Sequence, residues 1–572
     1  MGKDSWVSKG PISDYARLLA ISAFVGLFVG LAIVALSTLY SALWGLTLVT
    51  TRAYSYSIIL IPAVGFTLAY LIIRKVAVTK TTGCGTHELL EVYHYEGGVL
   101  PEKDTIVKPL ASTITIGLGG SAGLEGPSLL LGGGIASAIG RRLNLRPEQQ
   151  KISLLCGAAA GLSAIFKAPL TGILFALEIP YQRDLAKEAF VSATLASLLA
   201  YFTAINLVGS ETLFPLIPTL IIPSPLMILH AFAVGLAAVA CGAVFVNSFT
   251  ALDKLKSRFK VQALAYPLVG GLVIGVIGFC APQVLGVGYD TISEMVTGKF
   301  YGASLIFLVA LVLLKLFVTS VTLNSGGSGG LFIPSIYVGA VLGAIYAKAV
   351  IQSPSEIIVM AAMAAVLAAT NKTLLTSVVF VAETTGPSLI IPTLIAAATS
   401  YFASGSLSFY RDVQPLGKPI EEEEAVRVLL HQISRQRGFK KLVSTKVSEV
   451  MTPHAVALVD TMSIGEAMGI IKDHSYRVYP IVSQAGTLVG YTTVEDLLMI
   501  PEEKRHLTVS HMPMRTPLGI TKEDDLLRVA SRMLERNVDH AYVVSDLQEM
   551  KLVGVLADID ILRKLVERLK KQ

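Results

Sequence analysis

Long uncharged stretches dominate residues 1–410 of the chain. The chain is 53% hydrophobic and only 15% charged, against about 25% charged residues in an ordinary soluble domain. Six stretches reach the roughly 20 residues that an apolar helix needs to cross a bilayer, at 18–51, 53–73, 189–210, 261–289, 316–347 and 384–410. The pattern predicts a polytopic α-helical membrane protein. The first stretch is too long for a signal-peptide core, so we expect it to remain as an anchor.

The pattern changes after residue 410. Residues 411–442 are charged and helix-prone, which is typical of a linker out of the membrane. Beyond them the hydrophobic pattern predicts strand, helix, strand, strand and helix, and this order occurs twice, at 443–500 and 508–569. The two copies contain corresponding segments, YRVYPIVSQAGTLVGYTTVEDLL in the first and VDHAYVVSDLQEMKLVGVLADIDIL in the second. We therefore expect a duplicated soluble α/β module.

A second repeat lies within the membrane part. Two pairs of segments recur in order, GLEGPSLLLG (123–132) with GLFIPSIYVG (330–339), and KAPLTGILFALE (167–178) with KTLLTSVVFVAE (372–383). They define two homologous halves, at about 75–210 and 285–410. Repeated halves whose apolar segments are interrupted by glycine and proline indicate a binding site near the membrane midplane, built from broken helices.

Three glycine-rich breaks are candidates for such a site. They are TTGCGTHE (81–88), GGSAGLEGP (119–127) and GGSGGLFIP (326–334). Glycine permits a turn and proline fits the first turn of a helix, so each break is expected to start a helix inside the membrane. The first N–H groups of that helix have no partner within it, and the helix dipole attracts anions to this end. Three such ends converging on one point would build an anion site.

Glu125 is the single charge between two uncharged runs, 109–124 and 126–140. A charge at the bilayer centre costs about 2.5–3.5 kcal/mol, so it usually has a function. Its carboxylate would lie where the helix amides point, compete with an anion when ionised and leave when protonated. The alternative is a capping carboxylate in the first helix turn. Phe332, its counterpart in the second half, offers an amide and an apolar wall but no charge.

These motifs resemble those of the CLC family of chloride channels and anion/proton exchangers with a C-terminal pair of CBS domains. GLEGP resembles the family's G-[KR]-E-G-P, GLFIP its G-x-F-x-P and GCGTHE its G-S-G-I-P-E, while LSFYRDVQ (407–414) resembles the segment that carries the pore tyrosine. The resemblance covers nearly the whole chain. It implies a transmembrane domain, residues 1–410, of two inverted-repeat halves with broken, re-entrant helices, followed by an α/β CBS pair.

The resemblance also implies roles for individual residues. Glu125 would be the external gating glutamate, and Phe332 and Tyr410 would help to line the central anion site. The residues expected around the anion are Cys84, Gly85, Gly123, Leu124, Gly126, Leu331, Phe332, Ile333 and Tyr410. It further implies chloride transport in the cell membrane by a homodimer with one pore per subunit, and no enzymatic activity.

Several positions depart from the family pattern. Cys84 replaces a serine whose hydroxyl donates to the anion, and because a thiol is a weaker donor, the preferred anion stays open. His87 replaces the motif's proline, and Leu124 replaces the usual basic residue. Ile179 stands where family exchangers commonly carry an internal proton-transfer glutamate, and isoleucine cannot relay protons. We expect passive conduction; an anion/proton exchanger with a non-standard internal path, next to Glu178, is the alternative.

The two copies of the soluble module resemble the CBS signature G-x-x-[ST]-x-x-D, whose Asp receives ribose hydroxyls and whose Ser/Thr approaches a phosphate. The nucleotide-binding residues implied are Tyr476, Arg477, Thr493, Asp496 and Asp560, with Asp560 on the ribose and Tyr476 and Arg477 beside the adenine. Because Ala557 gives the second copy no hydroxyl, we expect one adenine nucleotide per pair, ATP, as a regulatory ligand. A purely structural or dimerising pair is the alternative. A nucleotide site requires the CBS domains to be cytosolic.

Other classes of function fit the residues less well. His87, Glu91 and His94 share one helical face, but they lack the HExxH spacing of a zinc enzyme. Ser328 in GGSGG has no histidine in the apolar segments of the second half to activate it as a protease nucleophile. No metal site is therefore expected. The net charge of +6 is scattered, which does not indicate nucleic-acid binding.

The acids and cysteines of the apolar segments are isolated. A cation transporter would require acidic clusters, whereas Glu125, Glu178 and Glu383 are separate. Lys167 with Glu178, and Lys372 with Glu383, are eleven residues apart, and we interpret them as interfacial charges or as structural pairs on one helix. The four cysteines have no paired spacing and are expected to be small core residues: Cys84, Cys156, Cys241 and Cys280.

Overall fold

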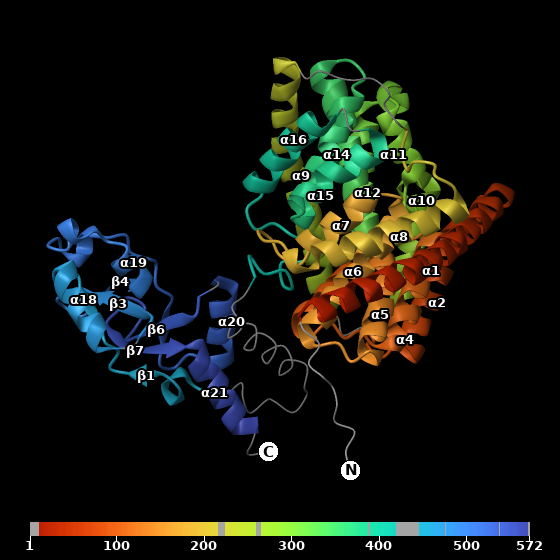
Figure 1. Ribbon diagram of the computed structural model, residues 1–572. Coiled ribbons are helices and arrows are strands. Elements are labelled where there is room, and N and C mark those ends of the chain that lie inside the picture. The colour runs from red at the N-terminus through yellow and green to blue at the C-terminus, as the bar shows by residue number, and fades with distance from the viewer. Residues whose placement is uncertain are drawn as a thin grey trace, which may run out of the picture. The chain divides into compact units, whose positions relative to one another are not determined.

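The computed structural model describes residues 11–215, 224–258, 265–386, 389–418, 445–474, 476–536 and 538–569. The chain divides into two compact units, Met1–Lys418 and Pro419–Gln572, drawn in red to teal and in blue in Figure 1. Most of the predicted linker, 411–442, lies outside the described residues. Its first part, 411–418, belongs to the first unit.

The first unit is helical. Its helices are α1 (Pro11–Ala53), α2 (Ser57–Val76), α3 (Gly85–Tyr95), α4 (Glu102–Gly117), α5 (Glu125–Arg142), α6 (Pro147–Phe166), α7 (Pro169–Glu178), α8 (Phe190–Val208), α9 (Pro225–Arg258), α10 (Ala265–Cys280), α11 (Tyr289–Val296), α12 (Leu305–Asn324), α13 (Phe332–Tyr346), α14 (Glu356–Asn371), α15 (Leu374–Thr385) and α16 (Ile390–Ala403). Six helical spans among the described residues are long and apolar enough to cross a membrane, within α1, α2, α8 with the turn before it, α9, α12 and α13 with the turn after it.

The helices do not follow the uncharged stretches one to one. The stretch 316–347 contains the end of α12 and the start of α13, because the glycines between them interrupt the helix. The described part of the stretch 384–410 contains the last two residues of α15 and the whole of α16, which has 14 residues. An uncharged stretch therefore indicates a segment within the membrane, whereas the glycines inside it determine where one helix ends and the next begins.

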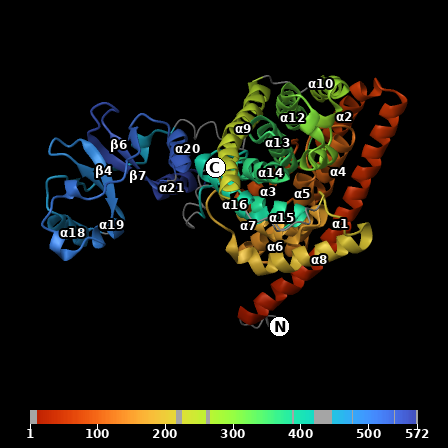
Figure 2. The same ribbon diagram turned by 90° about the horizontal axis from the view of Figure 1, so that it is seen from above.

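The predicted duplication is visible in the order of the helices. Helices α4 to α8 of the first half correspond to α12 to α16 of the second. Lys167 after α6 and Lys372 after α14 both adopt left-handed backbone, with φ of 53° and 60°, so both halves turn at the same place. In Figure 2, α1 and α9 run along the outside while α14 lies among other helices, in agreement with its buried residues from Ile358 to Asn371.

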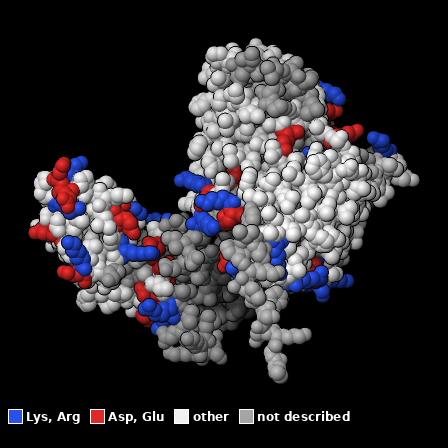
Figure 3. Space-filling view, viewed as in Figure 1, with Lys and Arg blue, Asp and Glu red and all other residues white. Residues whose placement is uncertain are grey.

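Small residues bring the inner helices close together. A side chain on Gly132 of α5 or Gly157 of α6 would overlap the backbone carbonyl of the other residue. Such close contact is typical of helix packing in membranes. The outer surface of the first unit in Figure 3 is broadly free of charge, and exposed Phe24, Phe28 and Leu31 of α1 give it the apolar character of a lipid-facing surface.

The second unit contains the predicted pattern twice. The first copy is β2 (Leu458–Val459), α18 (Ile464–Asp473), β3 (Val478–Val482), β4 (Leu488–Thr493) and α19 (Val494–Leu498); the second is β5 (Gly519–Thr521), α20 (Leu526–Arg536), β6 (His540–Val544), β7 (Leu552–Ala557) and α21 (Asp558–Leu569). The sheets have the orders β2-β3-β4 and β1-β7-β6-β5, where β1 is Thr452–Pro453. In each copy the first two strands are parallel and the last two antiparallel.

Candidate anion-binding site

The three glycine-rich breaks meet in the first unit. The Gly123 and Gly330 amides each donate to the other's carbonyl, at 3.0 and 2.9 Å, which places equivalent residues of the two halves opposite each other as a two-fold axis requires. The Gly85 amide donates to the Gly329 carbonyl at 3.0 Å, and the Gly329 amide donates to the Gly83 carbonyl at 3.1 Å. The convergence expected from the sequence is therefore present.

Each break starts a helix, at Gly85 of α3, Glu125 of α5 and Phe332 of α13. The residues before these starts, Cys84, Leu124 and Leu331, form no side-chain cap hydrogen bond. Apart from the Gly85 amide, which donates to the Gly329 carbonyl, the first-turn amides of the three helices are not capped by the preceding side chain and can face a negatively charged group. Three helix ends in contact give the site its positive potential without a lysine or arginine.

Glu125 occupies the amide end of α13. Its side chain is fully buried. Oε1 accepts a hydrogen bond from the Phe332 amide at 2.6 Å, and Oε2 has no hydrogen-bond partner in the described part of the chain. A side chain on Gly123 would overlap the carboxylate as it is placed here, and one on Gly330 would also meet the Gly126 backbone amide at 2.8 Å. The carboxylate lies where a bound anion would receive the amides of α13.

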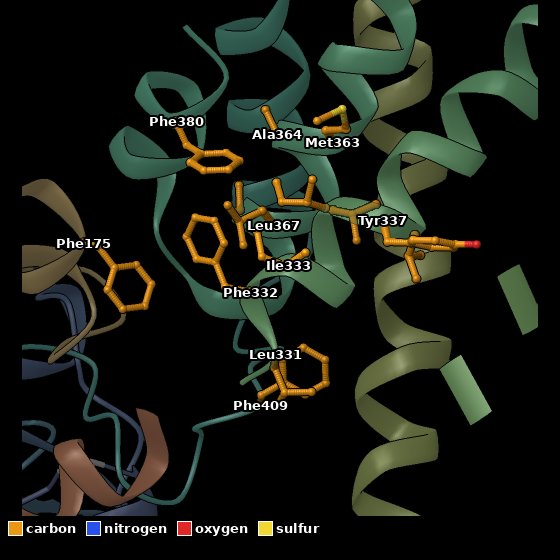
Figure 4. Close-up of a cluster of buried hydrophobic side chains, with 14 of the residues drawn as sticks. Phe175, Leu331, Phe332, Ile333, Tyr337, Met363, Ala364, Leu367, Phe380 and Phe409 are labelled. Atoms are coloured by element: carbon orange, nitrogen blue, oxygen red, sulfur yellow. The ribbon is translucent and has the colours of Figure 1, made fainter. Parts of the chain in front are cut away.

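Phe332 contributes the apolar wall. Its ring lies 5.5 Å from that of Phe175, 4.9 Å from that of Phe380 and 5.2 Å from that of Phe166, measured between centroids. Figure 4 shows Phe332 between Phe175 and Phe380, with Ile333 and Leu331 beside it. The rings come from both halves of the unit. An anion at this place would be shielded from water on the aromatic side.

Cys84 and Tyr410 are the other predicted pair that the fold brings together. The Cys84 Sγ and the Tyr410 hydroxyl are 3.8 Å apart, and Tyr410 is buried. Gly126 packs against the Gly329 carbonyl, and a side chain on Gly85 would meet the Gly126 carbonyl at 2.6 Å. All nine residues predicted around the anion therefore belong to the three breaks or to the Tyr410 turn beside them.

Ile179 is buried and follows α7 directly. Its carbonyl accepts from the Gln414 amide at 2.9 Å, and the same amide donates to the Asn371 carbonyl at 3.2 Å. Ile179 thus supports the turn that carries Tyr410. Its side chain has no proton to exchange.

A set of hydroxyl residues that we did not predict holds the breaks. Two residues of α4 hold Ser328. The Ser112 hydroxyl donates to the Ser328 hydroxyl at 2.8 Å, and the Ser328 amide donates to the Thr115 hydroxyl at 3.3 Å. Thr319 and Thr322 of α12 hold Ser121 in the same way, at 3.0 and 3.1 Å. Hydroxyl side chains of each half therefore hold the glycine-rich break of the other half. We call these two sets the hydroxyl clamps: Ser112 and Thr115 on Ser328, and Thr319 and Thr322 on Ser121. The signal was present in the sequence, because K-x₃-[ST]-x₂-T occurs at Lys108 and again at Lys315.

The two lysines that begin these motifs have different partners. Lys108 donates to both oxygens of Glu88 at 2.6 Å and to Thr81 at 3.1 Å. Lys315 is fully buried and donates to the carbonyls of Val284 and Gly286, at 3.1 and 3.2 Å, with its ammonium 4.6 Å from the centre of the Tyr337 ring.

The interpretation of Lys167 with Glu178, and of Lys372 with Glu383, as structural pairs on one helix is wrong. Lys167 ends α6 in a left-handed turn and Glu178 ends α7, so the two residues do not share a helix. Glu178 instead accepts from the Leu375 and Thr376 amides at the start of α15, at 2.9 and 2.7 Å.

The repeat shows the reciprocal arrangement. Glu383 accepts from the Leu170 and Thr171 amides at the start of α7, again at 2.9 and 2.7 Å. Each glutamate caps a helix of the opposite half. This pairing depends on the tertiary fold, and spacing along the chain does not show it.

The residues weighed for enzyme chemistry have separate contacts. His87 lies 2.8 Å from an Asp412 carboxylate oxygen, and His94 lies 2.8 Å from the Pro180 carbonyl. No group of three metal-ligating side chains is present among the described residues. Ser328 belongs to the hydroxyl clamp.

The predicted CBS residues have different partners in the two copies. In the first copy, Thr493 caps α19 by accepting from the Asp496 amide at 3.1 Å, and Arg515 binds both oxygens of Asp496 at 3.0 Å. The hydrogen bond from Arg515 holds the pKa of the Asp496 carboxyl below its usual value. Asp560 in the second copy accepts from the Ala557 amide at 3.3 Å, and Tyr476 is half exposed with its ring stacked on that of His474.

Comparisons with known proteins concern the family of the chain. A family model described as voltage gated chloride channel matches residues 65–405, and one described as CBS domain matches residues 447–503 and 509–567. The protein named voltage-gated ClC-type chloride channel ClcB of Escherichia coli is 28% identical over 303 residues, which are 51% of this chain and 70% of that protein.

Two solved structures share the fold. One is a slow cyanobacterial Cl⁻/H⁺ antiporter, with a TM-score of 0.62 and 21% identity over 69% of this chain and 97% of that chain. The other is a eukaryotic CLC transporter, with a TM-score of 0.59 and 19% identity over 96% of this chain and 98% of that chain. The second likeness extends over both units.

Proposed function

Because the chain belongs to the voltage gated chloride channel family, a family of channels and transporters and not of enzymes, we propose that Glu125 gates chloride or a related monovalent anion through an integral membrane pore. The observation that carries the proposal is the hydrogen bond from the Phe332 amide to the Glu125 carboxylate at 2.6 Å. The buried carboxylate takes the place of the anion at a helix end. When it is protonated it loses its charge, leaves the amide, and an anion replaces it.

Conduction in this proposal is passive. The supporting observation is Ile179, which is buried and has no titratable group at the position where an internal proton carrier is expected. Anion/proton exchange is the second candidate, because Glu125 is itself a proton acceptor and the cyanobacterial neighbour is described as a Cl⁻/H⁺ antiporter. The resemblance further supports a homodimer with one pore per subunit in the cell membrane.

The CBS pair in this proposal binds one adenine nucleotide, ATP, at Asp560. Asp496 is already bound on both oxygens by Arg515, whereas the Asp560 side chain accepts one hydrogen bond from its own helix start. The second cleft is therefore the one with a carboxylate available to ribose. This regulatory role places the CBS domains in the cytosol.

One experiment separates the two transport modes. The full chain is reconstituted in liposomes, a chloride gradient is imposed, and chloride release and internal pH are recorded together. We expect chloride flux without uphill proton movement. Sustained proton pumping driven by chloride would establish the exchanger, and a folded protein that passes no anion would refute the transport function itself.

A further inference from the structure

A second pair of side chains lies beside Cys84 and Tyr410. His87, in the first turn of α3, lies with Nε2 2.8 Å from Asp412 Oδ2. Cys84 precedes His87 by one helical turn, and Tyr410 precedes Asp412 by two residues. Two side-chain pairs therefore join α3 to the turn that carries Tyr410.

The Tyr410 turn is fixed on its other side. The Gln414 side chain donates to the Ile179 and Asn371 carbonyls, and the Phe409 amide donates to the Thr370 carbonyl at 3.0 Å. Two side-chain hydrogen bonds between the turn and the start of α3 are Cys84–Tyr410 and His87–Asp412, and the Thr86 side chain of α3 also lies close to the Tyr410 hydroxyl. The first is a 3.8 Å contact to sulfur, a weak donor and acceptor.

The His87–Asp412 pair is the stronger link when the imidazole is protonated, because a charge-assisted hydrogen bond is about twice as strong as a neutral one. The His87 side chain is 35% exposed and that of Asp412 is 69% exposed, so solvent protons reach the pair directly. The charged groups that face His87 are Asp412, Glu91 of α3 and Asp253 of α9. All are acidic, and histidine is the side chain that titrates near neutral pH.

We propose that His87 and Asp412 form a proton-dependent latch that positions Tyr410 against Cys84 at one end of the anion site. The proposal rests on the proposed anion transport. With the imidazole protonated, the latch holds the Tyr410 ring over the pore and flux is low. With the imidazole neutral, the ring is held less firmly and flux rises. The histidine takes the place of the proline in the family motif, so the latch is a property of this chain.

The test must separate the latch from Glu125, whose protonation acts on flux in the opposite direction. Chloride flux is therefore measured in liposomes with Glu125→Gln as the background, at about pH 5.5 and about pH 8, on either side of the histidine range. We expect flux at the higher pH to exceed that at the lower pH by about two- to fivefold, the factor that a partly exposed ion pair supplies.

Three variants in this background assign the effect. His87→Gln is expected to give high flux at both pH values, and Asp412→Asn the same. His87→Arg keeps the pair charged and is expected to give low flux at both. His506→Gln, at an exposed histidine of the CBS unit, is the matched control and should retain the pH ratio.

The outcomes are distinct. If His87→Gln and Asp412→Asn keep the pH ratio of the background while their thermal stability is unchanged, the latch is refuted and anion transport stands. If the unmodified chain passes no anion, the proposed function fails first. A merely structural pair would lower stability in all three variants without altering the pH ratio. Should His87→Gln not fold, Asp412→Asn provides the same comparison.

Discussion

In the first half of the transmembrane unit, Lys108 of α4 is paired with Glu88; in the second half, the equivalent Lys315 of α12 bonds only to backbone carbonyls and to the face of Tyr337 among the contacts described. The helix starts differ as well, because the first half places Glu125 where the second places Phe332. The hydroxyl clamps and the glutamate caps are the same in both halves.

The comparison separates scaffold from function. Duplicated features hold the two halves together, since each clamp and each cap reaches across to the other half. The features that occur in only one half are charged side chains and their partners. The first half supplies the Glu125 carboxylate, and the second supplies the Phe332 amide that donates to it and a buried lysine, Lys315, with no acid described beside it. In the proposed function, this difference between the halves allows the two-fold scaffold to bind an anion at the place that the Glu125 carboxylate occupies.

The largest expected effect is the difference in stability between variants of Lys108 and of Lys315. Lys108→Met would leave the largely buried Glu88, whose side chain is 15% exposed, without its cation, and removing one partner of a buried pair destabilises a protein by about 3–5 kcal/mol. Lys315→Met leaves only carbonyls without a donor and should cost about 1–3 kcal/mol. Thermal unfolding in detergent measures both. The double variant Glu88→Gln with Lys108→Met should recover much of the loss, and equal destabilisation by the two single lysine variants would contradict the asymmetry.

Removing the charge of Glu125 makes the two helix starts alike. Glu125→Gln should raise chloride flux at neutral pH by about tenfold, because a hydrogen bond to a charged group is worth about 1.5–3 kcal/mol and tenfold corresponds to about 1.4 kcal/mol. The fall in flux on raising the pH should disappear. Glu178→Gln is the control, since Glu178 caps α15; it should lower stability and keep the pH dependence of flux.

The hydroxyl clamps test whether the halves are truly reciprocal. Thr115→Val and Thr322→Val each leave one buried amide without its acceptor, at Ser328 and Ser121, which costs about 1–3 kcal/mol. We expect similar losses of thermal stability from both, and a lower ratio of chloride to nitrate flux. The corresponding Thr→Ser variants should restore both properties. A loss confined to one threonine would show that the clamps are not equivalent.

The smallest expected effect concerns the two CBS copies. Millimolar ATP should raise the thermal stability of the CBS unit in the full chain, and Asp560→Asn should abolish that increase while Asp496→Asn leaves it intact. Arg515 lowers the pKa of Asp496, so this pair stabilises the fold above the carboxyl's ordinary pKa of about 3.9 and the contribution is lost as pH falls through the lowered value. An ATP response that depends on Asp496 instead would reverse the assignment of the clefts.

Much of the site was predictable from local sequence. Glycine and proline fixed where α5 and α13 begin, and the repeat indicated that the two starts belong together. The repeat makes Glu125 and Phe332 equivalent positions, and the structure adds the hydrogen bond from the Phe332 amide to the Glu125 carboxylate at 2.6 Å. Local sequence could not show which residues of the two halves contact each other, such as Glu178 and the α15 amides. The left-handed turn at Lys167 separates α6 from α7, so Lys167 and Glu178 do not lie on one helix as their spacing suggested.

By itself the sequence determined the membrane class, the duplication and the helix breaks, because each depends on composition or on short motifs; the residues around an anion stay a prediction. Only the tertiary structure decided the crossed clamps and caps, the different partners of Lys108 and Lys315, and the link between His87 and Asp412. These contacts join residues far apart in the chain, and their partners are selected by how the two halves pack around their two-fold axis.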